Sequence, residues 1–203
     1  MQFPKAAKAI FSSVFLTLAT SGAALAHTGS DLGNHHGSTV QSLLAGLMHP
    51  LSGTDHLAAM LAVGIWSAVA LRGLWQAPLA FVSMLAVGAL AGFAGFQPAG
   101  VEPIIAASIV VLGLLISWRK GLSLGAVVAL VGMFAFFHGV AHGAELAAGQ
   151  QMAALVGMVV STAGLHLAGI RIGQLALSHR HRVRQAVGTG LTMLGTWLMM
   201  QAA

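Results

Sequence analysis

The sequence predicts an all-α membrane protein: a polytopic bundle of six transmembrane helices behind a cleavable signal peptide. Of its 203 residues, 57% are apolar and only 6% are Asp, Glu, Lys or Arg. Long apolar segments alternate with short connections, and the few charges sort between those connections. A soluble domain of this size needs about 25% charged residues to cover its surface. Lipid is therefore the expected solvent for most of the chain.

Composition also excludes several kinds of partner and chemistry. The formal net charge is +5, but apolar runs separate the nine basic residues. No continuous basic stripe exists for a phosphate backbone, so we expect no nucleic-acid partner. The absence of cysteine excludes disulfides, thiolate ligands and cysteine nucleophiles. Side-chain chemistry must rely on ten histidines and four acidic residues.

Residues 1–26 have the order of a secretory signal peptide. Lys5 and Lys8 precede an apolar stretch over 9–19, and a run of small residues ends at Ala26. This order predicts cleavage after Ala26, with an uncleaved first helix as the alternative. The expected division is a signal peptide over 1–26, a histidine-bearing segment outside the membrane over 27–38, and a transmembrane domain over 39–203.

Six apolar segments of the mature chain are long enough to be spans. A span needs about 20 apolar residues, and short connections favour antiparallel neighbours. Cutting at charges and at Gly/Pro clusters gives spans over residues 55–71, 76–96, 101–118, 122–146, 152–174 and 185–201. Glycines at small-xxx-small spacing predict close helix packing in lipid. These pairs are Gly88/Gly92, Gly121/Gly125, Gly139/Gly143 and Gly169/Gly173.

A short broken or interfacial helix is expected before the first span. The uncharged run over 56–71 has 16 residues, a length of about 24 Å that barely crosses the hydrocarbon. A helix over 39–51 would complete the region. Pro50 and Gly53 break the continuity, and Thr54 or Asp55 is a suitable N-cap for the helix that follows.

Charge sets the orientation, because Lys and Arg gather on the cytoplasmic side. With alternating spans, all seven basic residues of the mature chain fall inside and all four acids outside. The basic residues are Arg72, Arg119, Lys120, Arg171, Arg180, Arg182 and Arg184; the acids are Asp31, Asp55, Glu102 and Glu145. Both mature termini are then outside a bacterial inner membrane. The run over 179–184 is an orientation signal, with metal binding as its alternative.

Two His/acid clusters carry metal-ligand chemistry. The first contains His49, Asp55 and His56 at the expected helix break, where non-helical backbone can line a cavity. The second contains His138, His142 and Glu145. Their spacings of four and three residues place all three on one helix face. Imidazole and carboxylate in this pattern can hold a divalent ion. Topology places both clusters at the outer side.

Other histidines carry weaker signals. His166 stands in the fifth span with Thr162 one turn before it, so it either bonds to a neighbouring helix or lies on an inward ion route. The segment before the bundle carries His27, His35 and His36, which either capture metal outside or simply face water.

These clusters resemble the two signature motifs of the HupE/UreJ hydrogenase/urease accessory family. The motifs are H-P-L-S-G-T-D-H-L over 49–57, followed by Met60, Val63 and Gly64, and F-H-G-V-A-H-G-A-E over 137–145. The resemblance implies a secondary permease for Ni²⁺, or Co²⁺ in some members, that serves hydrogenase or urease maturation. It implies metal handling by His49, Asp55, His56, His138, His142 and Glu145. Lipid, the metal ion and cytoplasmic nickel chaperones are the implied partners.

Two other functions compete with transport. The chain could donate metal or assist assembly without moving ions across the membrane, or it could be a metal-dependent intramembrane hydrolase. It lacks H-E-x-x-H, and both clusters lie at the outer face, so we expect no enzyme. It also lacks a G-x-x-x-x-G-K-[ST] loop, so ATP hydrolysis in this chain is not expected. We expect no prosthetic group. Residue chemistry alone does not choose among divalent metals.

Overall fold

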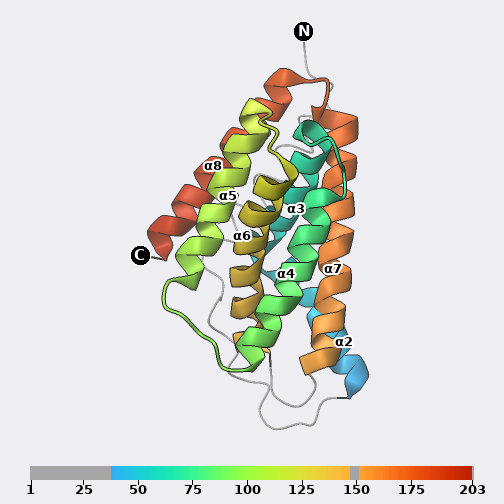
Figure 1. Ribbon diagram of the computed structural model, residues 1–203, viewed down its shortest axis with the longest axis vertical. Helices are drawn as coiled ribbons and strands as arrows, with labels where there is room; N and C mark the ends of the chain where they lie inside the picture. The colour runs from blue at the N-terminus through green and yellow to red at the C-terminus, as the bar shows by residue number, and fades with distance from the viewer. Residues whose placement is uncertain (1–37, 147–150, 203) are drawn as a thin grey trace. The chain divides into compact units, whose positions relative to one another are not determined.

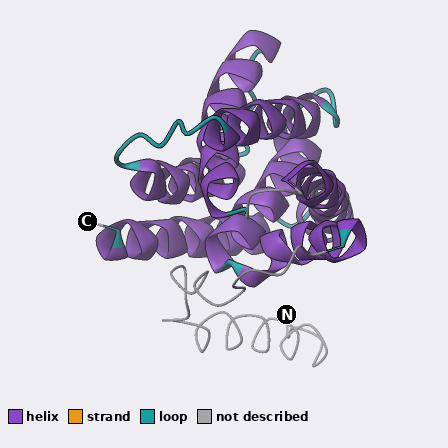
Figure 2. Cartoon of the chain, turned by 90° about the horizontal axis from the view of Figure 1, so that it is seen from below, coloured by secondary structure: helices purple, strands orange, loops and turns teal. Residues whose placement is uncertain are grey.

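The computed structural model describes residues 38–146 and 151–202. Within these ranges the chain is all-helical, with seven α-helices and one π-helical segment (Figures 1 and 2). The helices are α2 (Thr39–Ser52), α3 (Thr54–Ala70), α4 (Gln76–Phe93), α5 (Val101–Trp118), α6 (Leu124–Glu145), α7 (Gln151–Ile172), η1 (Gly173–Leu177) and α8 (His181–Gln201). The predicted signal peptide, His27, Asp31, His35 and His36 lie outside the described residues.

Helices α3 to α8 run alternately in opposite directions (Figure 1). Each corresponds to one of the six segments that hydropathy predicts. Four are long and apolar enough to cross a membrane: α4, α5, α6 and the continuous stretch Gln151–Leu177. The α3 helix is a shorter apolar helix of 17 residues. The α8 helix has 21 residues but includes Arg182 and Arg184.

The helix before the first span is present and ends later than expected. Ser38 begins α2 with a capping box, because its side chain accepts from the Gln41 N–H and the Gln41 side chain accepts from the Ser38 N–H. Pro50 lies within α2 and does not end it. The break is confined to Gly53, which has an extended backbone at φ −96° and ψ 127°.

The expected N-cap of α3 is wrong by one or two residues. Gly53 is the N-cap, and no side chain caps the helix. Thr54 and Asp55 are already helical. The Asp55 carboxylate lies 3.7 Å from the His56 ring nitrogen Nδ1, so it faces the neighbouring imidazole and does not turn back to the first free N–H groups.

The start of α8 also differs from the hydropathy division. The helix begins at His181, four residues before the predicted span, and takes in four of the six residues of the run over 179–184. Arg184 is only 6% exposed. A cut made at charged residues excludes the helical turn that carries them, although a helix continues through a charge whose side chain reaches the boundary.

Glycine faces bring two helix pairs into close contact. Added Cβ atoms show this: one at Gly92 of α4 would lie 2.7 Å from the Val140 carbonyl oxygen and 2.9 Å from Gly143 Cα of α6. The predicted Gly88/Gly92 and Gly139/Gly143 spacings thus face each other. Gly113 and Gly188 similarly join α5 to α8.

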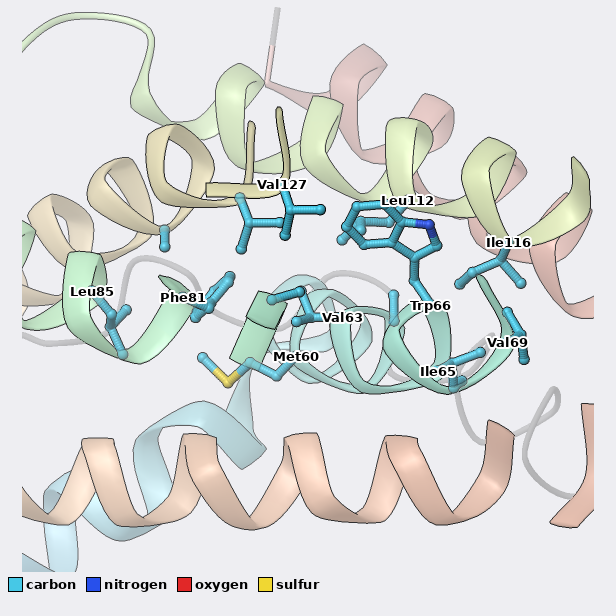
Figure 3. Packing of buried hydrophobic residues seen from close by; sticks show 14 of the residues in the cluster. Met60, Val63, Ile65, Trp66, Val69, Phe81, Leu85, Leu112, Ile116 and Val127 are labelled. Carbon is cyan, nitrogen blue, oxygen red and sulfur yellow. The ribbon is translucent and has the colours of Figure 1, made fainter. Parts of the chain in front are cut away.

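The core lies between α3 and its neighbours. Met60, Trp66, Phe81 and Leu85 are at most 1% exposed and belong to one cluster (Figure 3). At one end of this core the Trp66 Nε1–H donates to the Lys120 carbonyl over 2.8 Å. The Arg119 Nε–H donates to the Val69 carbonyl over 2.7 Å. These two bonds hold the end of α3 against the connection between α5 and α6.

Candidate metal-binding site

The two sequence clusters meet at one end of the bundle. His49 comes from the last turn of α2, Asp55 and His56 from the first turn of α3, and the second cluster from the end of α6. The His49 and His142 ring centroids are 4.6 Å apart. Those of His56 and His142 are 4.3 Å apart. All six residues expected from the motifs are therefore brought to one region by three helices.

His49, His142 and Glu145 form the tightest group of potential ligands. One ligand atom from each lies within 4.8 Å of the others. The His49 Nε2 is 3.1 Å from the Glu145 Oε2. The two imidazoles come from different helices, whereas His142 and Glu145 are one turn apart on α6. A cation between them would receive two nitrogens and one carboxylate oxygen, a donor set that suits divalent transition metals.

The remaining members lie directly behind this group. The His56 ring is 5.6 Å from the His138 ring, centroid to centroid. His56 is 9% exposed, while His138 and His142 have no exposed surface. At the front, the Glu145 side chain is 46% exposed and that of Asp55 is 33% exposed. The site is thus open at its carboxylates and at His49, whose side chain is 25% exposed, and closed at the other three imidazoles.

Several buried nitrogens in the cluster have no hydrogen-bond partner among the described residues. They are His49 Nε2, His56 Nδ1, His138 Nε2 and both ring nitrogens of His142. The first two lie 3.1 Å from Glu145 Oε2 and 3.7 Å from Asp55 Oδ2, respectively. The His138 Nδ1 is 2.9 Å from the Phe134 carbonyl oxygen. Because a carbonyl only accepts, this contact assigns the proton to Nδ1 and leaves the Nε2 lone pair open in the neutral ring. Buried polar atoms without partners are costly, so this concentration indicates a place for a bound cation.

His166 lies beyond the cluster and contacts it through Phe81. The Phe81 ring is 5.4 Å from the His138 ring and 5.0 Å from the His166 ring, each in an edge-to-face arrangement. Sequence reasoning missed Phe81, because one aromatic residue in an apolar span gives no signal. Met60 belongs to the first motif, and its position four residues after His56 places it on the same helix face.

The other candidates lie elsewhere. His179 and His181 are exposed beside the start of α8, and the structure groups no acidic residue with them in the part of the chain it describes. Glu102 lies in the first turn of α5 and is not among the residues of the His/acid cluster.

Comparison with known proteins identifies the family. The profile of the HupE/UreJ protein family matches residues 14–198. The chain belongs to the HupE/UreJ family. It is also 36% identical over 162 residues to Protein HupE of Rhizobium leguminosarum bv. viciae, a match that covers 79% of this chain and 85% of that protein. No solved structure is significantly similar.

Family and fold together describe a helical membrane protein. HupE/UreJ proteins have metal-transport or accessory roles. The four long apolar helices and the site of imidazoles and carboxylates agree with that assignment.

Proposed function

We propose that this HupE/UreJ protein is a secondary permease that takes up Ni²⁺ across the bacterial inner membrane for hydrogenase or urease maturation. The observation that carries the proposal is the convergence of His49, Asp55, His56, His138, His142 and Glu145 from three helices on one region. In this proposal these six residues form the outer site, which receives the ion.

The donor set supports a transition metal as the substrate. Imidazole nitrogens and carboxylate oxygens without thiolate suit Ni²⁺, Co²⁺ and Zn²⁺, and they disfavour ions that need an all-oxygen shell. The choice of nickel comes from the family, and cobalt is the second candidate. The shielded imidazoles supply affinity, whereas Glu145 and Asp55 attract the cation at the exposed rim.

Transport requires the site to face outward across a full set of spans. We propose that α3 to α8 are six transmembrane helices behind a cleaved signal peptide, with both mature termini outside. The inside-negative potential then favours inward movement of a divalent cation by about 4.6 kcal/mol per 100 mV, since each charge contributes roughly 2.3 kcal/mol. Cytoplasmic nickel chaperones would receive the ion.

Proteoliposomes that enclose a nickel-sensitive dye test this function. Purified full-length protein should admit external Ni²⁺ when the interior is made negative. His56→Ala and His142→Ala should each lower the initial rate about tenfold or more, since each removes a buried ligand. His179→Ala, which changes an exposed histidine away from the site, should leave the rate unchanged.

Two outcomes would contradict the proposal. A protein that binds nickel but gives no internal signal would be a donor or assembly factor. Normal uptake by correctly reconstituted His56→Ala and His142→Ala would show that the outer site is wrongly assigned.

A further inference from the structure

The His166 imidazole occupies the next position inward from the outer site. Its Nδ1 lies 2.8 Å from the backbone oxygen of Met60, which is four residues further along α3 than His56. An added Cβ on Gly64 would lie 2.8 Å from the Ile170 nitrogen, so this part of α7 follows α3 further inward. The His166 position is thus about 6 to 12 Å deeper than His56, at 1.5 Å per residue.

The hydrogen bond to Met60 leaves the second nitrogen of His166 open. A backbone carbonyl only accepts, so His166 Nδ1 donates and the neutral ring has its lone pair on Nε2. That Nε2 atom is buried and has no partner among the described residues, and the whole side chain is 1% exposed. A purely structural role is fulfilled by Nδ1 alone. It leaves unexplained why a residue with a second polar atom stands at this depth.

Met60 also contacts Thr162 of α7 through its side chain. The Thr162 Oγ1 donates to the Met60 Sδ over 3.4 Å, and Thr162 is one turn before His166 on α7. Thr162 and Met60 have no exposed surface. Figure 3 shows the Met60 side chain with its sulfur toward α7. Imidazole and thioether together favour a soft or borderline transition-metal ion over Mg²⁺ or Ca²⁺.

Phe81 contacts both this group and the outer site. Its ring has edge-to-face contacts with both His138 and His166. The Nε2 atoms of these two histidines, both without a partner among the described residues, thus belong to rings that share one apolar neighbour.

We propose that His166 Nε2, Met60 Sδ and Thr162 Oγ1 form a second, inner metal-binding site, which holds the ion after it leaves the outer site. This inference rests on the proposed function, because it gives the same ion a second position on its route. Few ligands and one neutral imidazole make the inner site weaker than the outer one, as passage requires.

Equilibrium binding of ⁶³Ni²⁺ to the purified full-length protein in detergent tests the inner site without requiring transport. The wild type should bind two ions per chain and His166→Asn one. The asparagine amide can still donate to the Met60 carbonyl from the position of Nδ1, but it has no counterpart of Nε2. If His166 has only a structural role, His166→Asn should bind two ions per chain, as the wild type does. If His166 is a ligand, the variant should bind one.

Met60→Leu is a second test, because it removes the sulfur and preserves both His166 and the Met60 backbone carbonyl. It should weaken the second binding step several-fold and leave the first unchanged. Two ions bound with unchanged affinities by both variants, or one ion bound by the wild type, would overturn the inner site. Wild-type liposomes without uptake would contradict the permease instead, since the count of bound ions does not depend on translocation.

Discussion

Of the three potential ligands His49, His142 and Glu145, Glu145 has the most exposed side chain. Its carboxylate contacts His49 from α2, and it shares α6 with the buried His142. In the proposed permease, the charge of Glu145 would therefore lie where an ion first leaves water. Its removal should affect capture of the ion more than its later movement, because the imidazoles behind it remain in place.

Glu145→Gln should weaken Ni²⁺ binding at the outer site by about tenfold, since it preserves the shape of the side chain but removes the anionic ligand. Calorimetric titration of the purified protein measures the dissociation constant. Glu145→Asp is the matched control and should give an intermediate value, because the charge is kept on a shorter side chain. Equal affinities for wild type and Glu145→Gln would exclude the carboxylate as a ligand.

At the scale of single residues, the motif spacings predict which side chains come together but not what lies behind them. His138, His142 and Glu145 share a helix face by arithmetic, and the break at Gly53 predicts that His49 and His56 belong to different helices. The contact between His166 and Met60 joins residues 106 positions apart. No local pattern predicts such a contact, and the contacts of Phe81 with two histidines depend on how α4 packs.

The pairing of α4 with α6 positions the second cluster. Gly139 and Gly143 each follow a histidine of α6 and pack closely against α4, so the histidines lie on the adjacent face of the helix, about 100° away. This close approach depends on the absence of side chains at the contact. The packing glycines and the candidate ligand histidines thus occupy neighbouring positions of the same nine-residue motif.

Gly92→Ala should lower the apparent melting temperature of the detergent-solubilised protein by several degrees. The added methyl would lie 2.7 Å from the Val140 carbonyl oxygen, and overpacking of this kind costs about 1 to 3 kcal/mol. Gly164→Ala on α7 is the control, because nothing lies within 4 Å of its added Cβ. Equal melting temperatures for the two variants would show that α4 and α6 are not closely packed.

At the scale of elements, hydropathy predicts helix existence well and helix ends less well. The predicted segment over 101–118 coincides with α5. The α7 helix continues through the π-helical segment to Leu177, beyond the predicted end at 174, and α8 begins before its predicted start. An apolar run indicates only the part of a helix that lies in hydrocarbon, whereas the helix continues as far as its backbone hydrogen bonds do.

Over the whole molecule, charge separates along the helix axes. Among the described residues, Arg72, Arg119 and Lys120 follow the ends of α3 and α5, and the other Arg residues lie at the end of α7 and the start of α8. The acids of the described residues are in the first turns of α3 and α5 and the last turn of α6. The predicted orientation, with the candidate metal site outside, depends on these same charges.

Single cysteines test that orientation, because the natural chain has none to interfere. Ala99→Cys lies in the connection between α4 and α5, and His179→Cys lies just before α8. A membrane-impermeant maleimide should label Ala99→Cys in intact spheroplasts and His179→Cys only after permeabilisation. Labelling of both from the same side would contradict the six-span arrangement.

Because of the one-residue break at Gly53, metal binding would be linked to movement of α2. His49 precedes the break and Asp55 follows it, while Glu145 belongs to a third helix. An ion bound by both His49 and Glu145 would link α2 to α6. Any swing of α2 about Gly53 that parts those two side chains must weaken the hold on the ion. By reciprocity, the ion must resist the same swing with equal free energy.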